Sequence, residues 1–176
     1  SLPVSAPRML GLLAYLHLQG AASRPELEMM FWPGQGANAV RQGLYTLRRL
    51  PGAEHWLRQE GQQVTLHADS DVQEMQTALQ AGQDERALDL LSAGPLLGHL
   101  SVTGSVEFSD WLEDRRGELL EARRAVLRRE AARYARLENW AQARTHLHTL
   151  LTLDPLDEHT YRDLMRLEGQ SGNPDA

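Results

Sequence analysis

Polar and basic side chains follow one face of the segment 37–50. The members of this set, which recur mostly at intervals of three and four residues, are Asn38, Arg41, Gln42, Tyr45, Arg48 and, at the flank, Arg49. On a helix such positions share one side. Guanidinium groups, amides and a phenol can donate hydrogen bonds to phosphate oxygens and to the edges of bases. This spacing predicts recognition of double-stranded DNA rather than a covalent reaction.

Two roles are expected within this set of side chains. The candidates for contacts with base edges are Arg41, Gln42 and Tyr45. The candidates for contacts with phosphates are Asn38, Arg48 and Arg49. Taken alone, a polar helix face is typical of a solvated surface. The neighbouring elements are therefore needed to distinguish a DNA-binding face from a solvated one.

The helices predicted before and within residues 37–50 can position this polar face. Apolar residues on nearly all sides predict a buried helix over 7–20. Ser23 and Glu26 have the spacing of a capping box and predict the start of a second helix. In the third helix, over about 37–50, the inward stripe is expected to contain Ala37, Val40, Leu44 and Leu47.

A short β-hairpin is predicted after the third helix. The segments 56–59 and 63–67 flank Glu60, Gly61 and Gln62, and Gly61 can adopt the left-handed conformation of the turn. Three helices followed by a hairpin is the element order of a winged helix-turn-helix, with the hairpin as the wing. Arg58 in the hairpin is a further candidate for contact with a phosphate or a minor groove; the alternative is a solubilising residue on an exposed strand.

This first half resembles a known family of bacterial regulators. Leu12 to Leu18, Phe31-Trp32-Pro33 and the segment 37–50 are similar to the OmpR-type winged helix of SARP-type transcriptional activators. The resemblance implies activation by recruiting RNA polymerase and binding to direct repeats as a side-by-side homodimer. Members carry a small sheet before the first helix, and because only Ser1 to Ala6 precede it here, we expect part of the domain to be missing.

The second half is expected to consist of helical hairpins. Two short helices are predicted over 71–82 and 84–92, followed by a long helix from about Glu107 to the Glu138-Asn139 pair. A 34-residue repeat template of the tetratricopeptide type can be laid on the positions Leu127, Glu130, Ala131, Tyr134, Ala143, Leu147 and Pro155. Shifted by one repeat, the template falls on Tyr161, Leu164 and Met165.

Two further stretches carry a second resemblance. Phe108, Trp111-Leu112 and Arg115, together with the segment 153–158, resemble the bacterial transcriptional activator domain that follows the winged helix in the same family. Members continue into another helix, whereas this sequence ends at Gly172-Asn173-Pro174-Asp175-Ala176, so we expect a larger parent protein.

Composition narrows the function classes. The chain has no Cys, and all 18 basic residues are Arg, which excludes thiolate metal sites, Schiff-base lysines and lysine-dependent phosphate loops. The net charge is −6, but it is unevenly distributed: residues 1–68 carry six Arg against four acids, and residues 69–176 carry twelve Arg against twenty acids. A mildly basic first half suits a DNA-facing module, and an acidic second half suits one that faces protein or solvent.

Three other patterns favour structural interpretations. The stretch Gly34 to Ala39 matches a dinucleotide-binding fingerprint, but a helix rather than a strand is expected before it. His146 and His148 are two apart on a helix, so their rings should face different sides, and no metal site is predicted. Eight Arg and three Glu between Arg115 and Arg136 indicate a solvated face, with a second DNA contact as the less favoured alternative.

Together these patterns predict a mainly α protein. A winged helix-turn-helix over 1–68 is followed by a helical module related to tetratricopeptide repeats over 69–176. The first hypothesis is a bacterial, cytoplasmic DNA-binding regulator without enzymatic activity or cofactor and without contact with a membrane, whose helical module binds RNA polymerase or another protein. The alternative is a regulatory fragment that mediates protein–protein interaction and does not bind DNA autonomously.

Overall fold

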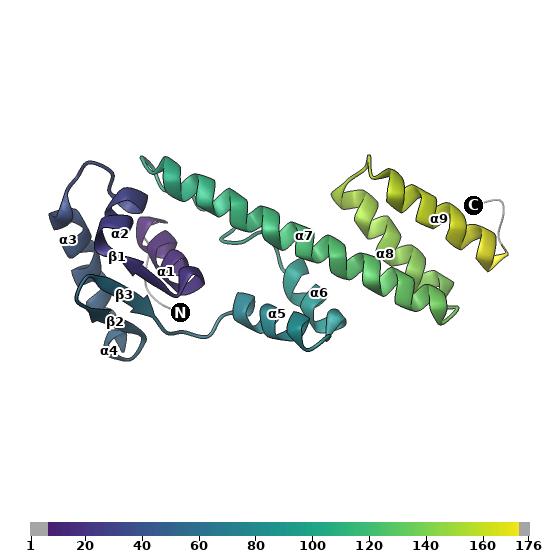
Figure 1. The fold of residues 1–176 in the computed structure, drawn as a ribbon, viewed down its shortest axis with the longest axis horizontal. Helices are drawn as coiled ribbons and strands as arrows, with labels where there is room; N and C mark the ends of the chain where they lie inside the picture. Colours follow the sequence, from purple (N-terminus) through teal and green to yellow (C-terminus); the bar gives the residue numbers. More distant parts are fainter. Residues whose placement is uncertain (1–6, 173–176) are drawn as a thin grey trace. The chain divides into compact units, whose positions relative to one another are not determined.

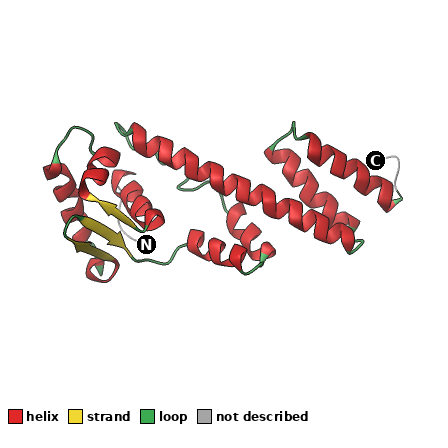
Figure 2. Ribbon diagram, viewed as in Figure 1, coloured by secondary structure: helices red, strands yellow, loops and turns green. Residues whose placement is uncertain are grey.

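The computed structural model describes residues 7–172, so the expectations about Ser1 to Ala6 and Asn173 to Ala176 lie outside the described residues. The protein is mainly α with one small sheet, which confirms the predicted fold class (Figures 1 and 2). The chain folds into two compact units. The first contains residues up to 70 together with 94–116, and the second contains 71–93 and the residues from 117 onward.

The first unit combines helices with three short strands (Figure 1). Its elements before residue 70 are α1 (Pro7–Gln19), β1 (Ala21–Ser23), α2 (Arg24–Phe31), α3 (Ala37–Arg48), α4 (Ala53–Trp56), β2 (Leu57–Glu60) and β3 (Gln63–Leu66). The strands form an antiparallel sheet in the order β1-β3-β2, drawn in yellow in Figure 2. Because β1 lies between two helices in sequence, its pairing with β3 joins the hairpin to the helical part of the unit.

Local sequence signals explain where α2 begins. The Ser23 hydroxyl accepts a hydrogen bond from the Glu26 backbone N–H at 3.3 Å, and the Glu26 carboxylate accepts one from the Ser23 N–H at 3.2 Å. The predicted capping box is therefore confirmed. Glu26 also accepts a hydrogen bond from the Tyr15 hydroxyl at 2.6 Å, and burial raises the pKa of that phenol, as does this hydrogen bond.

Two elements of the first unit differ from the sequence-based expectation. The segment 53–56 forms the short helix α4, so the hairpin begins at Leu57 rather than at Trp56. The register pairs Glu60 with Gln63, which leaves Gly61 and Gln62 as a two-residue turn. Gly61 has φ +59°, as the turn requires. Strand β1, with the sequence Ala-Ala-Ser, carries no signal of its own and was not expected.

The core of the first unit extends beyond residue 68. Its fully buried side chains include Leu12, Leu16, Leu27, Phe31 and Leu47. Val102, Phe108 and Leu112, which the sequence places within the second domain, belong to the same core. Aromatic rings connect the two segments: Phe108 lies 4.9 Å from Phe31 between ring centroids. The domain boundary at residue 68 stays a prediction. The hydrophobic core of the first unit includes residues up to 112.

The second unit consists of helices only, within the described residues. They are α5 (Asp71–Gln80), α6 (Asp84–Ser92), the second part of α7 (Val106–Arg136), α8 (Trp140–Leu153) and α9 (Glu158–Ser171). Helices α5 and α6 pack as one hairpin and α8 and α9 as another. Ala131 and Ala143 are buried against Leu147 and Leu150, as expected for two closely approaching helices.

The end of the second unit corrects part of the repeat template. Leu164 is half-buried against the core, but Tyr161 is 48% exposed and Met165 is 75% exposed. Pro155 lies in the turn before α9, and Asp157 is the residue that caps this helix, because its carboxylate accepts a hydrogen bond from the His159 N–H at 3.1 Å. The template therefore identifies the buried side of α8 better than that of α9.

Candidate nucleic-acid interface

Helix α3 presents one polar face to solvent. All six predicted side chains of this segment are exposed: Asn38, Arg41, Gln42, Tyr45, Arg48 and Arg49. The opposite side is buried through Val40, Leu44 and Leu47. Ala37 was expected on the buried stripe but is exposed, since it is the first residue of the helix. The amphipathic face that the sequence predicts is thus formed.

A close contact between the backbone of Gly43 and the ring of Trp32 holds α3 against the end of α2. Gly43 is buried on α3, and the indole of Trp32, which follows the end of α2, occupies the space where a Cβ atom would project. Trp32 itself is only 5% exposed. Trp32 is expected only as part of the stretch that carries the family resemblance, and its contact with Gly43 was not predicted, because the two residues are eleven apart and the signal is only a glycine inside a helix.

The β2–β3 hairpin lies beside the C-terminal half of α3. Arg48 donates a hydrogen bond to the side chain of Gln59 in β2, and the Gln59 amide donates to the carbonyl of Gly61 at 3.1 Å. These contacts connect α3 with the turn of the hairpin. Arg58, the neighbour of Gln59, is exposed. Gln59 was not among the predicted residues, and its connecting role depends on a contact between segments that the sequence does not reveal.

The predicted residues differ in how far the fold engages their side chains. Arg49 lies over the ring of Tyr45, 5.8 Å from its centroid, so these two form a cation–π pair. Arg48 is engaged by Gln59. Within residues 7–172 no hydrogen bond or ion pair restrains the side chains of Arg41 and Arg58. Both remain available to an external partner.

The arginines of the chain fall into two electrostatic groups. None of the six between residues 1 and 68 forms an ion pair with a carboxylate of the described residues: Arg8, Arg24, Arg41, Arg48, Arg49 and Arg58. In the second unit, ion pairs hold most of the arginines; the paired ones are Arg86, Arg124, Arg128, Arg129, Arg133, Arg144, Arg162 and Arg166. Arginines without an internal counterion are therefore concentrated in the first group, and in the second unit only Arg123 and Arg136 lack an ion pair among the described residues.

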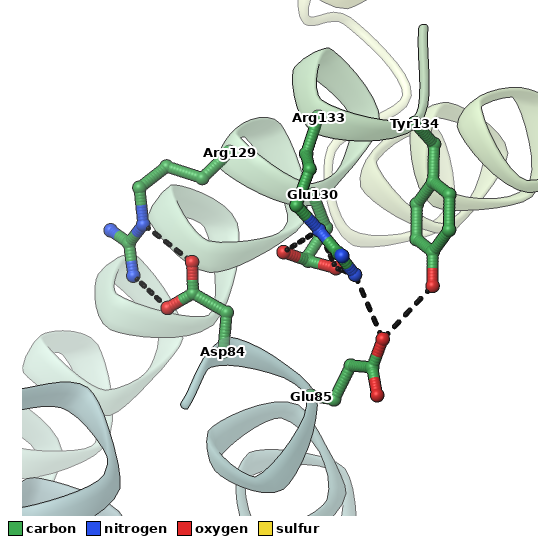
Figure 3. A network of polar contacts seen from close by, with 6 residues as sticks. All are labelled: Asp84, Glu85, Arg129, Glu130, Arg133 and Tyr134. Atoms are coloured by element: carbon green, nitrogen blue, oxygen red, sulfur yellow. Dashed lines mark hydrogen bonds and ion pairs between the residues drawn. The ribbon is translucent and has the colours of Figure 1, made fainter. Parts of the chain in front are cut away.

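The arginine run of α7 is largely satisfied within the second unit (Figure 3). Arg129 donates two hydrogen bonds to Asp84, at 2.9 and 2.6 Å, and these hold the pKa of that carboxyl below its usual range. Arg133 contacts both Glu130 and Glu85, and the Tyr134 hydroxyl donates to Glu85 at 3.0 Å. Because these guanidinium groups have partners, the structure favours the interpretation of the run as a network of intramolecular pairs over a second DNA contact.

Other chemistry finds no support in the described residues. The stretch Gly34 to Ala39 follows helix α2 and not a strand, so the dinucleotide fingerprint lacks its structural context. His146 stacks on Tyr134 with 5.5 Å between centroids, while His148 is exposed. No group of three or more metal-binding side chains occurs among residues 7–172. Over the same range, every helix is too short or too polar to cross a membrane.

The elements described so far define a helical protein with a small sheet and an exposed basic helix. The sequence profile of the bacterial transcriptional activator domain matches residues 66–176. This match covers more than half of the chain, so the chain belongs to the bacterial transcriptional activator domain family. Its role is accordingly of the transcriptional activator type, and the family is regulatory rather than enzymatic. No curated protein matches the chain in a sequence search.

Proposed function

We propose that the protein is a bacterial transcriptional regulator whose first unit is an OmpR-type winged helix that binds double-stranded DNA. In this proposal α3 enters the major groove, Arg41, Gln42 and Tyr45 face base edges, and Asn38 contacts phosphates. The β2–β3 hairpin is the wing. Its Arg58, together with Arg48 and Arg49, contacts the sugar–phosphate backbone beside the groove.

The observation that carries the proposal is the set of arginines without internal counterions. An exposed guanidinium without a carboxylate partner retains its full attraction for phosphate, and binding releases counterions condensed on the DNA. In the first unit Arg41 and Arg58 are exposed in this way, and Arg49 stacks only on a neutral ring. The negative net charge of the chain opposes this less than its value suggests, because most acids of the second unit lie beside arginines of the same unit.

The same proposal assigns a protein-binding role to the second unit. Membership in the activator domain family supports a role in transcriptional activation. In our proposal these helices contact RNA polymerase or another protein, and the chain binds repeated DNA sites as a side-by-side homodimer. A function on bacterial DNA also implies a cytoplasmic protein. Neither catalysis nor a cofactor is part of this mechanism.

A second candidate function is protein interaction without autonomous DNA binding. The observation that favours it is the apolar surface near α9: Leu156 is 86% exposed and Met165 is 75% exposed. Exposed apolar side chains of this size occur on surfaces that bind protein partners, although single ones are common on any protein. Under this alternative the basic face of α3 is a solvated surface.

Fluorescence anisotropy with the whole chain distinguishes the two. Labelled promoter-derived and mixed-sequence duplexes are titrated at about 50 and 200 mM salt, with Arg41→Ala alongside. The proposal predicts affinity that falls steeply with salt, and about a 5- to 100-fold loss in Arg41→Ala on the preferred duplex. Absence of binding by the parent chain at low salt contradicts it and leaves the second candidate. Arg162→Ala, an exposed arginine of α9 paired with Glu158, is the matched control and should bind like the parent.

A further inference from the structure

An open pocket lies beside α3, on the side where α1 and the end of α2 approach it. Its lining includes Arg8 of α1, Trp32, and Asn38, Gln42 and Thr46 of α3. All of these residues belong to the first unit. Asn38, Gln42 and Thr46 are spaced by four, so one stripe of the helix forms the floor of the pocket.

The charge of the pocket is positive and uncompensated. Among residues 7–172, Arg8 is its single charged lining residue and no carboxylate lines it. Arg8 donates one hydrogen bond, from Nη2 to the carbonyl of Thr103 at 3.0 Å, which holds the side chain without neutralising it. A guanidinium has five N–H groups, so donors remain. The Gln42 and Asn38 side chains add amide donors to the same wall.

This combination of donors fits an anion with several acceptor oxygens. We propose that the pocket binds a phosphate of the DNA backbone, with Arg8 as the cation and Gln42 and Asn38 as neutral donors. The inference rests on the proposed function and deepens it, because it adds a second backbone contact and moves Gln42 from base reading to phosphate binding. Arg8 was not expected to contact DNA from the sequence.

Two observations favour a phosphate in a duplex over a small free ligand. The pocket is an open hollow, whereas sites for small molecules usually enclose most of the ligand. It is also continuous with the exposed face of α3, since Asn38 and Gln42 belong to both. A helix in a major groove has a sugar–phosphate strand on each side. Near the C-terminal end of α3, Arg48 contacts Gln59 of the hairpin. Arg48 is thus a further basic group of α3 outside the set of base-reading candidates.

The test is the salt dependence of DNA affinity for Arg8→Gln and Arg8→Lys in the whole chain. Losing one phosphate contact should lower the slope of log affinity against log salt by about 0.9 for Arg8→Gln. The affinity at low salt should fall about tenfold, and equally for promoter-derived and mixed-sequence duplexes, because a phosphate carries no sequence information. Arg8→Lys keeps the charge and should keep the slope. Arg162→Gln in α9 is the charge-matched control and should leave both quantities unchanged.

Circular dichroism shows whether Arg8→Gln folds. A second variant, Gln42→Ala, keeps the inference testable if it does not. Gln42 is exposed, so Gln42→Ala should fold normally. A phosphate role predicts the same loss of affinity on all sequences for this variant, and a loss confined to one sequence overturns the assignment. An unchanged slope in folded Arg8→Gln overturns the inference while the proposed function stands, provided that Arg41→Ala weakens binding. No binding by the parent chain overturns both.

Discussion

At the scale of single residues, the fold decides which charged groups are available to a partner. Arg41 and Arg129 have the same side chain, but Arg41 has no restraining partner among residues 7–172, whereas Arg129 is held by both oxygens of Asp84. Exposed ion pairs contribute little stability individually, yet they neutralise charge. The second unit therefore contains many arginines and presents little free positive charge, which composition alone does not reveal.

Asp157 is the residue whose ionisation should matter most for the second unit. The Thr160 hydroxyl, followed by the Arg128 guanidinium, holds the pKa of Asp157 at about 2. Because this value is below that of an unfolded Asp, about 3.9, the charged form stabilises the fold. The contribution is complete above pH 4 and is lost as the pH falls from about 4 toward 2.

Asp157→Ala should lower the stability of the second unit by about 1 kcal/mol at pH 7, since it removes a helix cap and a screened ion pair. Thermal melts at pH 7, 4 and 2 check this. The difference between the parent and the variant should shrink at pH 2. A difference that stays constant with pH would show that the carboxylate charge is irrelevant. Asp163→Ala, at an exposed pair with Arg166, is the control and should cost much less.

At the scale of elements, the position of α3 depends on a glycine. An added Cβ at Gly43 would overlap the Trp32 indole, which is itself buried and cannot move into solvent. We predict that Gly43→Ala destabilises the first unit by about 1–3 kcal/mol, as overpacking of a core does. Denaturant unfolding followed by circular dichroism measures the change.

Gly117→Ala provides the matched comparison. Gly117 is also inside a helix, but nothing lies within 4 Å of the position of its added Cβ. Removing the flexibility of a helical glycine should stabilise the protein by about 0.5–1 kcal/mol. If Gly43→Ala also stabilises the protein, the close contact with Trp32 is not a constraint on α3.

Elements with strong local signals could be predicted from the sequence, and those that depend on pairing could not. The capping box at Ser23 and the periodic stripe of α3 are local, and both are present. Strand β1 exists because β3 pairs with it, and its three small residues have no strand pattern of their own. The hairpin was displaced by one residue because the turn of helix α4 includes Trp56.

At the scale of the whole molecule, the chain returns to its first core after the α5–α6 hairpin. Phe108 is 1% exposed and contacts Phe31, and its ring fills the space above Gly11. The sequence could not show this, because Phe108 has the helical spacing of any amphipathic segment and its partner Phe31 is 77 residues away. The exposed DNA-binding candidates on α3, by contrast, could be predicted from the periodicity of that helix alone.

Phe108→Ala should therefore weaken the first unit although it lies outside residues 1–68. Loss of a large buried ring costs about 3–5 kcal/mol. Hydrogen exchange measured by mass spectrometry should show faster exchange in peptides from α1 and α2. Leu147→Ala, in the core of the second unit, should accelerate exchange in α8 and α9 instead. Equal effects of both variants on the peptides of α1 would contradict the assignment of Phe108 to the first core.

We propose that DNA is contacted through α3 and the hairpin and not through the helices of the second unit. Photochemical cross-linking to duplexes that contain 5-bromouracil tests it most directly, because the chain carries an internal control. Tyr45 on α3 is 61% exposed, and Tyr161 on α9 is 48% exposed, so both rings are accessible. We expect cross-linked peptides that contain Tyr45, and we expect their yield to fall in Arg41→Ala. Cross-links at Tyr161, or equal yields in the parent and in Arg41→Ala, would contradict the proposal.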